Sequence, residues 1–354
     1  MRIKSSVLKS SILFIFFLLT LLMQLIFKCN ALLTEKFYST GLYPYIAKVL
    51  SSASVRVPFS LGDAFYVSLI LLLLAGLVLL ALRKIGFGRF LIRVLQTIAL
   101  VYVLFYWLWG FNYYRQSAHQ RLHLNKSPTN DSIFIRNFIY VIEQTNYYYS
   151  PQTQFKPAIT DALIEASYKS KSAYLGYEYP MGRNRTKRIT FSDFFAKATI
   201  LGYYGPFFNE THVNKHLTAW DIPVVTAHEK SHRLGITSEA EAGFYGWLIC
   251  VNSKDDFISY AGWLYVLDYF IYQSRGIKNR KELIAKIRPE VLGDMSVRNA
   301  HWRSWRNEKI DDVTTKVNDA YLKSNNIQKG IDDYNDVVQL IIDFLEGEQS
   351  AESG

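Results

Sequence analysis

The stretch DIPVVTAHEKSHRLGITSEAEAGFYGWLIC (residues 221–250) decides how the second half of the chain folds. Asp221 is a suitable N-cap for a helix that runs to Gly235, and glycine often ends a helix in the left-handed conformation. Ser238, with Glu241 three positions later, has the pattern of a capping box, which starts a new helix. The stretch therefore predicts two helices joined by a short turn.

The first of these helices carries two histidines four residues apart. His228 and His232 share one face, because residues at this spacing are neighbours on a helix. Imidazole is a common zinc ligand, and catalytic zinc sites take three protein ligands and leave a fourth position for water. Glu229 is placed to accept a proton from that water rather than to bind the metal. The sequence predicts a Zn²⁺ site with Glu229 as the catalytic base.

Two glutamates compete for the place of the third ligand. Glu239 and Glu241 follow His232 by seven and nine residues, and the intervening chain is long enough to turn back to the metal. The capping box explains Glu241 without any metal. We therefore prefer Glu239 as the third metal ligand and keep Glu241 as the alternative.

Other histidines and tyrosines carry weaker signals. His212 and His216 have the same spacing, but no acidic partner follows them and Glu210 precedes them, so a strand end or a surface loop is the better interpretation. His301 is followed by Trp302 and Trp305 and is interpreted as a packing residue. Candidate donors to a tetrahedral oxyanion are Tyr203, Tyr204 and Tyr321.

Three apolar runs near the N-terminus are each about as long as a bilayer is thick. They cover residues 8–27, 64–82 and 90–110. A cleaved signal peptide is the alternative for the first run, but no small-x-small cleavage site follows it, so a retained anchor is preferred. We expect a membrane domain at residues 1–110 with three transmembrane helices, and a second domain at residues 111–354.

Basic residues set the expected orientation, because loops rich in lysine and arginine stay in the cytoplasm. They precede the first run and crowd the short link between the second and third runs: Arg2, Lys4, Lys9, Arg83, Lys84, Arg89 and Arg93. The expected protein is a multi-pass protein of the cell membrane whose C-terminal domain is extracytoplasmic. Its first partner is thus the lipid bilayer.

The net charge of +10 does not indicate a nucleic-acid partner, because part of it flanks the membrane spans. Two cysteines, Cys29 and Cys250, do not make a disulfide framework. Cys250 lies in an apolar run and is interpreted as a buried thiol.

The rest of the C-terminal domain is predicted to be mostly helical. Apolar residues recur at three- and four-residue spacing in residues 132–149 and 157–175, and helical patterns continue to residues 334–347. Residues 188–208 are richer in aromatic and β-branched residues and favour strands. The predicted class is α-rich α+β.

Two resemblances build on these residues. His228, Glu229, His232 and the following glutamates resemble the H-E-x-x-H motif and third ligand of gluzincin metallopeptidases, with a short spacer. The longer stretch 202–250 resembles an uncharacterised family of bacterial membrane proteins, and residues 109–115 and 318–341 fit it too. That family is similar in having spans followed by an extracytoplasmic, gluzincin-like domain.

The resemblance implies a zincin-like fold, with His228, His232 and Glu239 on zinc and Glu229 as the base. One position departs from the gluzincin pattern. The aspartate that orients a zinc histidine in gluzincins falls at Gly243, so the acceptor for that histidine must come from elsewhere.

Together these features lead us to expect a membrane-anchored zinc metallopeptidase that hydrolyses peptide bonds of an unidentified peptide or protein substrate. A zinc-binding membrane scaffold or sensor without hydrolytic activity is the alternative. The sequence leaves the oligomeric state open.

Overall fold

The computed structural model of the protein describes residues 2–177, 179 and 185–352. The chain forms two compact units. Unit 1 comprises Met1–Gln116 together with Gly205–Glu210, and unit 2 comprises Ser117–Tyr204 together with Thr211–Gly354. Helices dominate both units, and the strands are few and short, as the predicted α-rich class requires.

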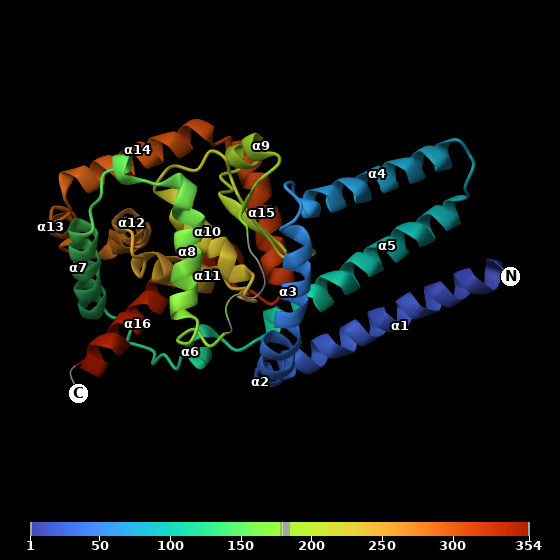
Figure 1. Ribbon diagram of the computed structural model, residues 1–354, viewed down its shortest axis with the longest axis horizontal. Helices are drawn as coiled ribbons and strands as arrows, with labels where there is room; N and C mark the ends of the chain where they lie inside the picture. The colour runs from blue at the N-terminus through green and yellow to red at the C-terminus, as the bar shows by residue number, and fades with distance from the viewer. Residues whose placement is uncertain (1, 178, 180–184, 353–354) are drawn as a thin grey trace. The chain divides into compact units, whose positions relative to one another are not determined.

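Unit 1 contains three long apolar helices, α1 (Arg2–Cys29), α4 (Leu61–Ala81) and α5 (Phe87–Leu108). Each is long and apolar enough to cross a membrane, with candidate spans at Ser11–Cys29, Leu61–Ala81 and Phe87–Leu108. The three predicted spans are thereby confirmed, with ends shifted by a few residues. Figure 1 shows α5 running beside both α1 and α4. Shorter elements of the unit are α2 (Ala31–Leu33), the π-helix η1 (Thr34–Leu42), α3 (Tyr43–Ser54) and η2 (Gly110–Tyr114).

A buried carboxylate completes the start of α4. The Glu210 carboxylate accepts hydrogen bonds from the backbone N–H groups of Leu61 (3.2 Å) and Gly62 (2.9 Å). Ser60 Oγ accepts a third, from the N–H of Asp63 (2.9 Å). These N–H groups have no partner within the helix, and a carboxylate is favourable beside them because the N-terminal end of a helix is positive.

Unit 2 combines many helices with most of a small sheet. In chain order its helical elements are α6 (Ala118–Arg121), α7 (Asp131–Tyr147), η3 (Gln152–Gln154), α8 (Pro157–Lys171), α9 (Ser192–Lys197), α10 (Asp221–His232), α11 (Glu239–Val251), α12 (Asp256–Gln273), η4 (Ser274–Gly276), α13 (Arg280–Ile284), α14 (Pro289–Trp305), α15 (Glu308–Ser324), η5 (Gly330–Asp336) and α16 (Val337–Glu352). The strands are β1 (Lys187–Arg188), β2 (Gly202–Gly205) and β3 (Glu210–Val213).

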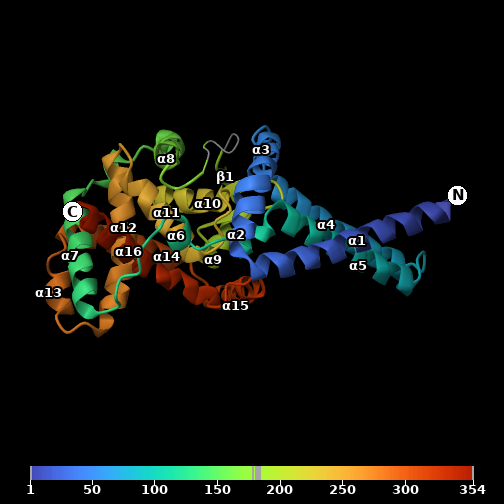
Figure 2. The same ribbon diagram turned by 90° about the horizontal axis from the view of Figure 1, so that it is seen from below.

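The centre of unit 2 is α11, of whose 13 residues ten are buried. A helix that is apolar on every side must be covered on every side. Helices α8, α10, α12 and α16 all pack against it, as Figures 1 and 2 show. Glycines allow the closest approaches: a Cβ at Gly246 would lie 3.3 Å from the Val224 carbonyl oxygen of α10. A Cβ at Gly262 of α12 would lie only 2.8 Å from Cys250 Cβ.

The three strands form one sheet in the order β1-β3-β2, with β1 parallel to β3 and Lys187 opposite His212. The strand prediction for residues 188–208 is wrong in its middle, where α9 forms. Ser192 and Ala196, one helical turn apart, are both buried in α9, so the inward-facing residues repeat with the helical period. Of the predicted strand region only Arg188 and Gly202–Gly205 form strands.

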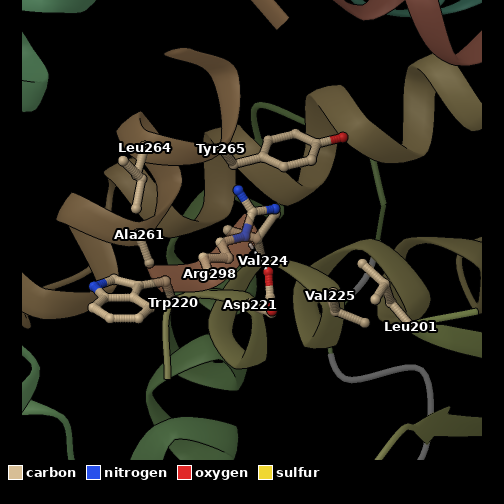
Figure 3. A pocket seen from close by; sticks show the side chains of 9 residues that line it. All are labelled: Leu201, Trp220, Asp221, Val224, Val225, Ala261, Leu264, Tyr265 and Arg298. Carbon is tan, nitrogen blue, oxygen red and sulfur yellow. Dashed lines mark hydrogen bonds and ion pairs between the residues drawn. The ribbon is translucent and has the colours of Figure 1, made fainter. Parts of the chain in front are cut away.

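A charged cluster joins α10, α12 and α14. Arg298 of α14 donates to Asp221 at the start of α10 (2.5 Å) and to Asp268 of α12. Trp302 Nε1 donates to the other oxygen of Asp221 (2.8 Å). Figure 3 shows the Arg298 guanidinium between the Asp221 carboxylate and the ring of Tyr265, on the wall of a cavity of about 30 Å³. The predicted N-cap role of Asp221 is wrong: Trp220 is the N-cap, because this carboxylate serves Arg298 instead.

Burial and ion pairing shift the pKa values of the carboxyl groups in this cluster in opposite directions. Burial works to raise the pKa of Asp221, but the Arg298 charge and hydrogen bonds from Thr218 and Trp302 hold that pKa below its usual value. Burial raises the pKa of Asp268, although Arg298 opposes the shift. Both carboxyls therefore depend on one guanidinium.

We expect Arg298→Gln to destabilise the folded chain by about 3–5 kcal/mol, because it leaves two buried carboxyls without their counter-charge. Urea unfolding of the full chain in detergent, followed by tryptophan fluorescence, measures the loss. Arg288→Gln is the control: Arg288 forms an exposed pair with Glu290, and its guanidinium lies 4.6 Å from the Tyr149 ring, so we expect a loss of at most about 1 kcal/mol. Equal losses in both variants would contradict the prediction.

The stability lost in Arg298→Gln should also depend on pH. In the wild-type chain the folded pKa of Asp221 lies below its unfolded value of about 3.9. Its contribution to stability is therefore present above that value and is lost as the pH falls through the folded pKa. Without Arg298, burial raises the folded pKa of Asp268 further, and only the hydrogen bonds from Thr218 and Trp302 still oppose the effect of burial on the pKa of Asp221. The deficit of Arg298→Gln should be largest near about pH 8 and shrink towards about pH 5.

Candidate metal centre

Helix α10 and the first turn of α11 bring three potential ligands together. His228 Nε2 lies 3.1 Å from Glu239 Oε2, and His232 Nε2 lies 3.7 Å from the same oxygen. One ligand atom from each of the three residues lies within 4.8 Å of the other two. The turn between the helices is possible because Gly235 adopts a φ of +75°, which a glycine reaches without strain. Over residues 2–177, 179 and 185–352, this is the one group of three such side chains that could hold a metal ion.

The backbone orients one imidazole. His232 Nδ1 lies 2.7 Å from the carbonyl oxygen of Ile236. A carbonyl oxygen only accepts, so Nδ1 carries the proton and donates it, and Nε2 faces Glu239. Gly243 has no side chain that could accept a hydrogen bond from a histidine. For His232 the acceptor is the Ile236 carbonyl oxygen. A Cβ at Gly243 would lie 2.7 Å from the Tyr265 hydroxyl oxygen, so the glycine makes room for that phenol.

The three groups shift one another's pKa values. Burial works to lower the pKa of His228, but its hydrogen bond to Glu239 and the charges of Glu229 and Glu239 leave that pKa raised. Burial lowers the pKa of His232, against the Glu239 charge. Burial works to raise the pKa of Glu239, but the two histidines leave it lowered. The group thus combines a carboxylate with two imidazoles in a site largely closed to water.

Glu229 lies beside this group and is only 6% exposed. Burial raises its pKa to about 8, and the His228 charge opposes the shift. The strand β2 runs against it: a Cβ at Gly202 would lie 2.7 Å from Glu229 Cγ and 2.8 Å from Oε1. The same Cβ would be 2.9 Å from the carbonyl oxygen of His212. Gly202 therefore keeps open the space that the Glu229 side chain occupies.

Glu241 lies away from the three ligands. Its carboxylate pairs with Arg121 and accepts a hydrogen bond from the N–H of Ala118 (2.7 Å). Ser238 is the N-cap of α11, and its hydroxyl accepts the N–H of Glu241 (3.3 Å). The N-cap half of the predicted capping box is present, whereas the Glu241 carboxylate binds α6. The structure thus brings Glu239, and not Glu241, to the histidine pair.

Two residues beside Glu239 carry no signal in the sequence. The Asp333 carboxylate accepts hydrogen bonds from Ser238 Oγ (2.8 Å) and from the N–H of Ala240 (3.1 Å). Burial raises the pKa of Tyr334 well above its usual value, and the charges of Glu239 and Glu229 raise it further. Both belong to η5, more than 90 residues further along the chain. No spacing rule connects them with the motif.

The other histidines that the sequence singled out lie in structural surroundings. His216 Nε2 lies 2.6 Å from Asp193 Oδ1, and its ring lies 3.9 Å from that of Trp305. His301 Nε2 donates to the carbonyl oxygen of His216 (2.7 Å). His212 is fully buried at the end of β3. None of them joins the group formed by His228, His232 and Glu239.

The three tyrosines suggested by the sequence lie in different places. The Tyr203 ring stacks on that of His212 at 4.5 Å. The Tyr204 ring lies 6.2 Å from that of His232, at the edge of the metal centre. Tyr321 is 40% exposed on α15. Tyr204 is thus the tyrosine of this group whose ring lies beside the candidate ligand His232.

Residues 38–342 match the model of a protein family described as "Protein of unknown function (DUF3810)". The match covers most of the chain and includes the candidate metal centre. Neither a search of curated proteins nor a search of solved structures finds a match to the chain.

We expect Gly202→Ala to destabilise the chain by about 1–3 kcal/mol, because the new methyl group would overlap Glu229 and the fixed backbone at His212. Thermal unfolding of the full chain in detergent measures the loss. Gly276→Ala is the control, since its Cβ would meet nothing within 4 Å.

A double variant tests the cause. Gly202→Ala combined with Glu229→Ala should recover part of the loss, because truncation removes the two overlapping Glu229 atoms. Additive losses in the double variant would rule out Glu229 as the neighbour that Gly202 accommodates.

Proposed function

We propose that the chain, which belongs to the DUF3810 family, is a membrane-anchored zinc metallopeptidase that hydrolyses peptide bonds outside the cytoplasm. One observation carries the proposal. Two imidazoles and one carboxylate lie within 4.8 Å of one another, with the buried carboxyl group of Glu229 beside them.

The donor set fits a catalytic zinc ion. Two histidine nitrogens and one carboxylate oxygen are a ligand combination that zinc peptidases use, and three protein ligands leave a fourth position open. Divalent zinc would also balance the buried negative charge of Glu239. The hydrogen bond from His232 Nδ1 to Ile236 is the kind of outer contact that fixes a zinc-binding imidazole. We therefore assign His228, His232 and Glu239 as ligands.

The chain supplies the acid–base chemistry through Glu229. A bound zinc ion contributes a Lewis acid, which polarises a carbonyl group and lowers the pKa of water. Glu229 accepts the proton of the attacking water and returns it to the leaving amine. Burial raises the pKa of Glu229 to about 8, and the positive charge of a bound zinc ion would lower it again, which favours the carboxylate form that accepts the proton.

The three candidate spans support an anchor in the cell membrane. The basic residues before the first span and in the link between the second and third favour a cytoplasmic location for both segments. An odd number of spans then puts the metal centre on the outer side. The proposed substrate is a peptide or protein on that side.

We expect the purified full chain to bind about one zinc ion, and the ion to be lost in His228→Ala, His232→Ala and Glu239→Ala. Metal analysis after gel filtration measures the content. Glu241→Ala is the matched control: it removes a glutamate two positions away that pairs with Arg121, so zinc content should stay at the wild-type level. Loss of zinc in Glu241→Ala alone would reverse the assignment of the third ligand.

Glu229→Gln should keep the zinc ion and lower peptide hydrolysis by at least about 100-fold, because glutamine has the size of glutamate but cannot accept the proton. A peptide library incubated with the zinc-loaded chain detects cleavage. Glu290→Gln, an exposed glutamate on α14, is the control and should cleave as the wild type does.

The same variant separates an enzyme from a zinc-binding scaffold or sensor. If Glu229→Gln supports full function in the host cell while His228→Ala does not, zinc is structural and the peptidase proposal is wrong.

A further inference from the structure

The segment between the end of α12 and the start of α14 is strongly basic. Residues 275–288, called the basic segment below, contain one acidic side chain, Glu282, and six basic ones: Arg275, Lys278, Arg280, Lys281, Lys286 and Arg288. A net charge of +5, half of the +10 of the whole chain, is thus concentrated in this segment. Such a local excess attracts negatively charged partners.

The basic segment has a fixed fold within unit 2. Leu283 and Ile287 are buried and anchor it to the core. The N–H of Ile277 donates to the carbonyl oxygen of Ser274 (3.0 Å), and the N–H of Arg280 donates to that of Ile277 (3.2 Å). With the apolar side chains turned inward, the exposed side chains include five of the six cations: Arg275, Lys278, Lys281, Lys286 and Arg288.

Two arginines, one at each end of the segment, lie on tyrosine rings. The guanidinium carbon of Arg275 is 4.3 Å from the centre of the Tyr272 ring, and that of Arg288 is 4.6 Å from the centre of the Tyr149 ring. The Tyr149 ring lies in turn 5.4 Å from that of the buried Tyr260. An aromatic ring under a guanidinium restrains it, and the planar fork of N–H groups matches a carboxylate. Both arginines are therefore partly preorganised for carboxylate binding.

The charges of the segment are poorly balanced within the protein. Arg288 forms an exposed pair with Glu290 (3.4 Å), and Arg280 Nε donates to the Ser274 hydroxyl (3.2 Å). Exposed lysines elsewhere in unit 2, such as Lys323, pair with a neighbouring carboxylate. Across the described ranges 2–177, 179 and 185–352, no ion pair is formed by Lys278, Lys281 or Lys286.

An anionic bilayer fits this surface less well than a polar polyanion does. Segments that bind the surface of a bilayer combine basic residues with apolar side chains that enter the lipid. In the basic segment Leu283 and Ile287 are buried, and Ile277 and Ile284 are half-buried. The segment offers charge and guanidinium forks, but no exposed large apolar side chain.

We infer that the basic segment is a docking surface for an acidic stretch of a polypeptide, whose carboxylates bind Arg275, Arg288 and the lysines between them. The inference rests on the proposed function only in taking a polypeptide as the partner, because binding at this surface needs no metal ion. For the proposed peptidase it implies substrates that carry an acidic stretch apart from the bond that is cleaved.

The test measures binding of a fluorescein-labelled oligoglutamate peptide to the full chain in a non-ionic detergent, by fluorescence anisotropy at low ionic strength. The peptide should bind, and its affinity should fall as salt is added, because salt screens exposed charges. An oligoglutamine peptide of the same length has no carboxylates and should not bind.

A triple variant removes the three lysines of the segment. Lys278→Gln, Lys281→Gln and Lys286→Gln together should weaken oligoglutamate binding by at least about tenfold, because three attractive charges are lost. The matched control removes the same charge from exposed lysines of α8 and α15 and should change the affinity by less than about twofold. It combines Lys169→Gln, Lys309→Gln and Lys316→Gln.

A single variant tests the stacked arginine. Arg275→Lys keeps the positive charge but loses the planar fork that lies on Tyr272. Oligoglutamate should bind about three- to tenfold more weakly than to the wild type. The substituted side chains of all these variants are exposed, so the chains should fold as the wild type does.

The outcomes separate this inference from the proposed function. Absence of oligoglutamate binding to the wild type, or an equal loss in both triple variants, would overturn the inference. It would also be wrong if inorganic polyphosphate bound the segment and oligoglutamate did not, because the partner would then be a phosphate polymer.

The metal ion distinguishes the two proposals. A chain stripped of metal by a chelator, with the chelator then removed, should bind oligoglutamate as the untreated chain does. A chain that binds oligoglutamate but no zinc contradicts the proposed function alone, whereas a chain that binds zinc but no oligoglutamate contradicts this inference alone.

Discussion

The close approach of α10 to α11 is the contact on which the rest of unit 2 depends. It is possible because Gly246 has no side chain: a Cβ there would lie 3.3 Å from the Val224 carbonyl oxygen and 3.4 Å from His228 Cβ. With the helices this close, the histidine face of α10 meets the first turn of α11. The geometry of the candidate metal centre is thus a consequence of core packing, which tolerates little change in volume.

Two of the buried groups of charges in unit 2 differ in how they are balanced. Arg298 lies between two carboxylates and is hydrogen-bonded to both, so that group is complete within the protein and ties three helices together. At the candidate metal centre, two carboxyl groups and two imidazoles share a site, and no arginine or lysine pairs with either carboxyl in the part of the chain that the structure describes. Such an arrangement suits a cation, because buried carboxylates are costly without a positive partner.

Several features of this protein were determined by the sequence alone, because they depend on neighbours along the chain. Runs of about 20 apolar residues make the three candidate spans. The spacing of His228 and His232 places both on one face of a helix wherever that helix lies in the fold. Ser238 caps α11 with its own hydroxyl. Cys250 lies in an apolar run and is buried, as that run predicts.

Other features were decided only by the tertiary structure. Glu239 and Glu241 both lie in the first turn of α11. The sequence favoured Glu239 as the third metal ligand but kept Glu241 as the alternative. Arg121 of α6 pairs with Glu241, while Glu239 Oε2 lies 3.1 Å from His228 Nε2. Asp221 has the sequence of an N-cap, yet Arg298 occupies its carboxylate from 77 residues away. The physical reason is the same in each case: a hydrogen bond or ion pair between distant segments is stronger than a weak local preference, and no periodicity in the chain reports where those segments meet.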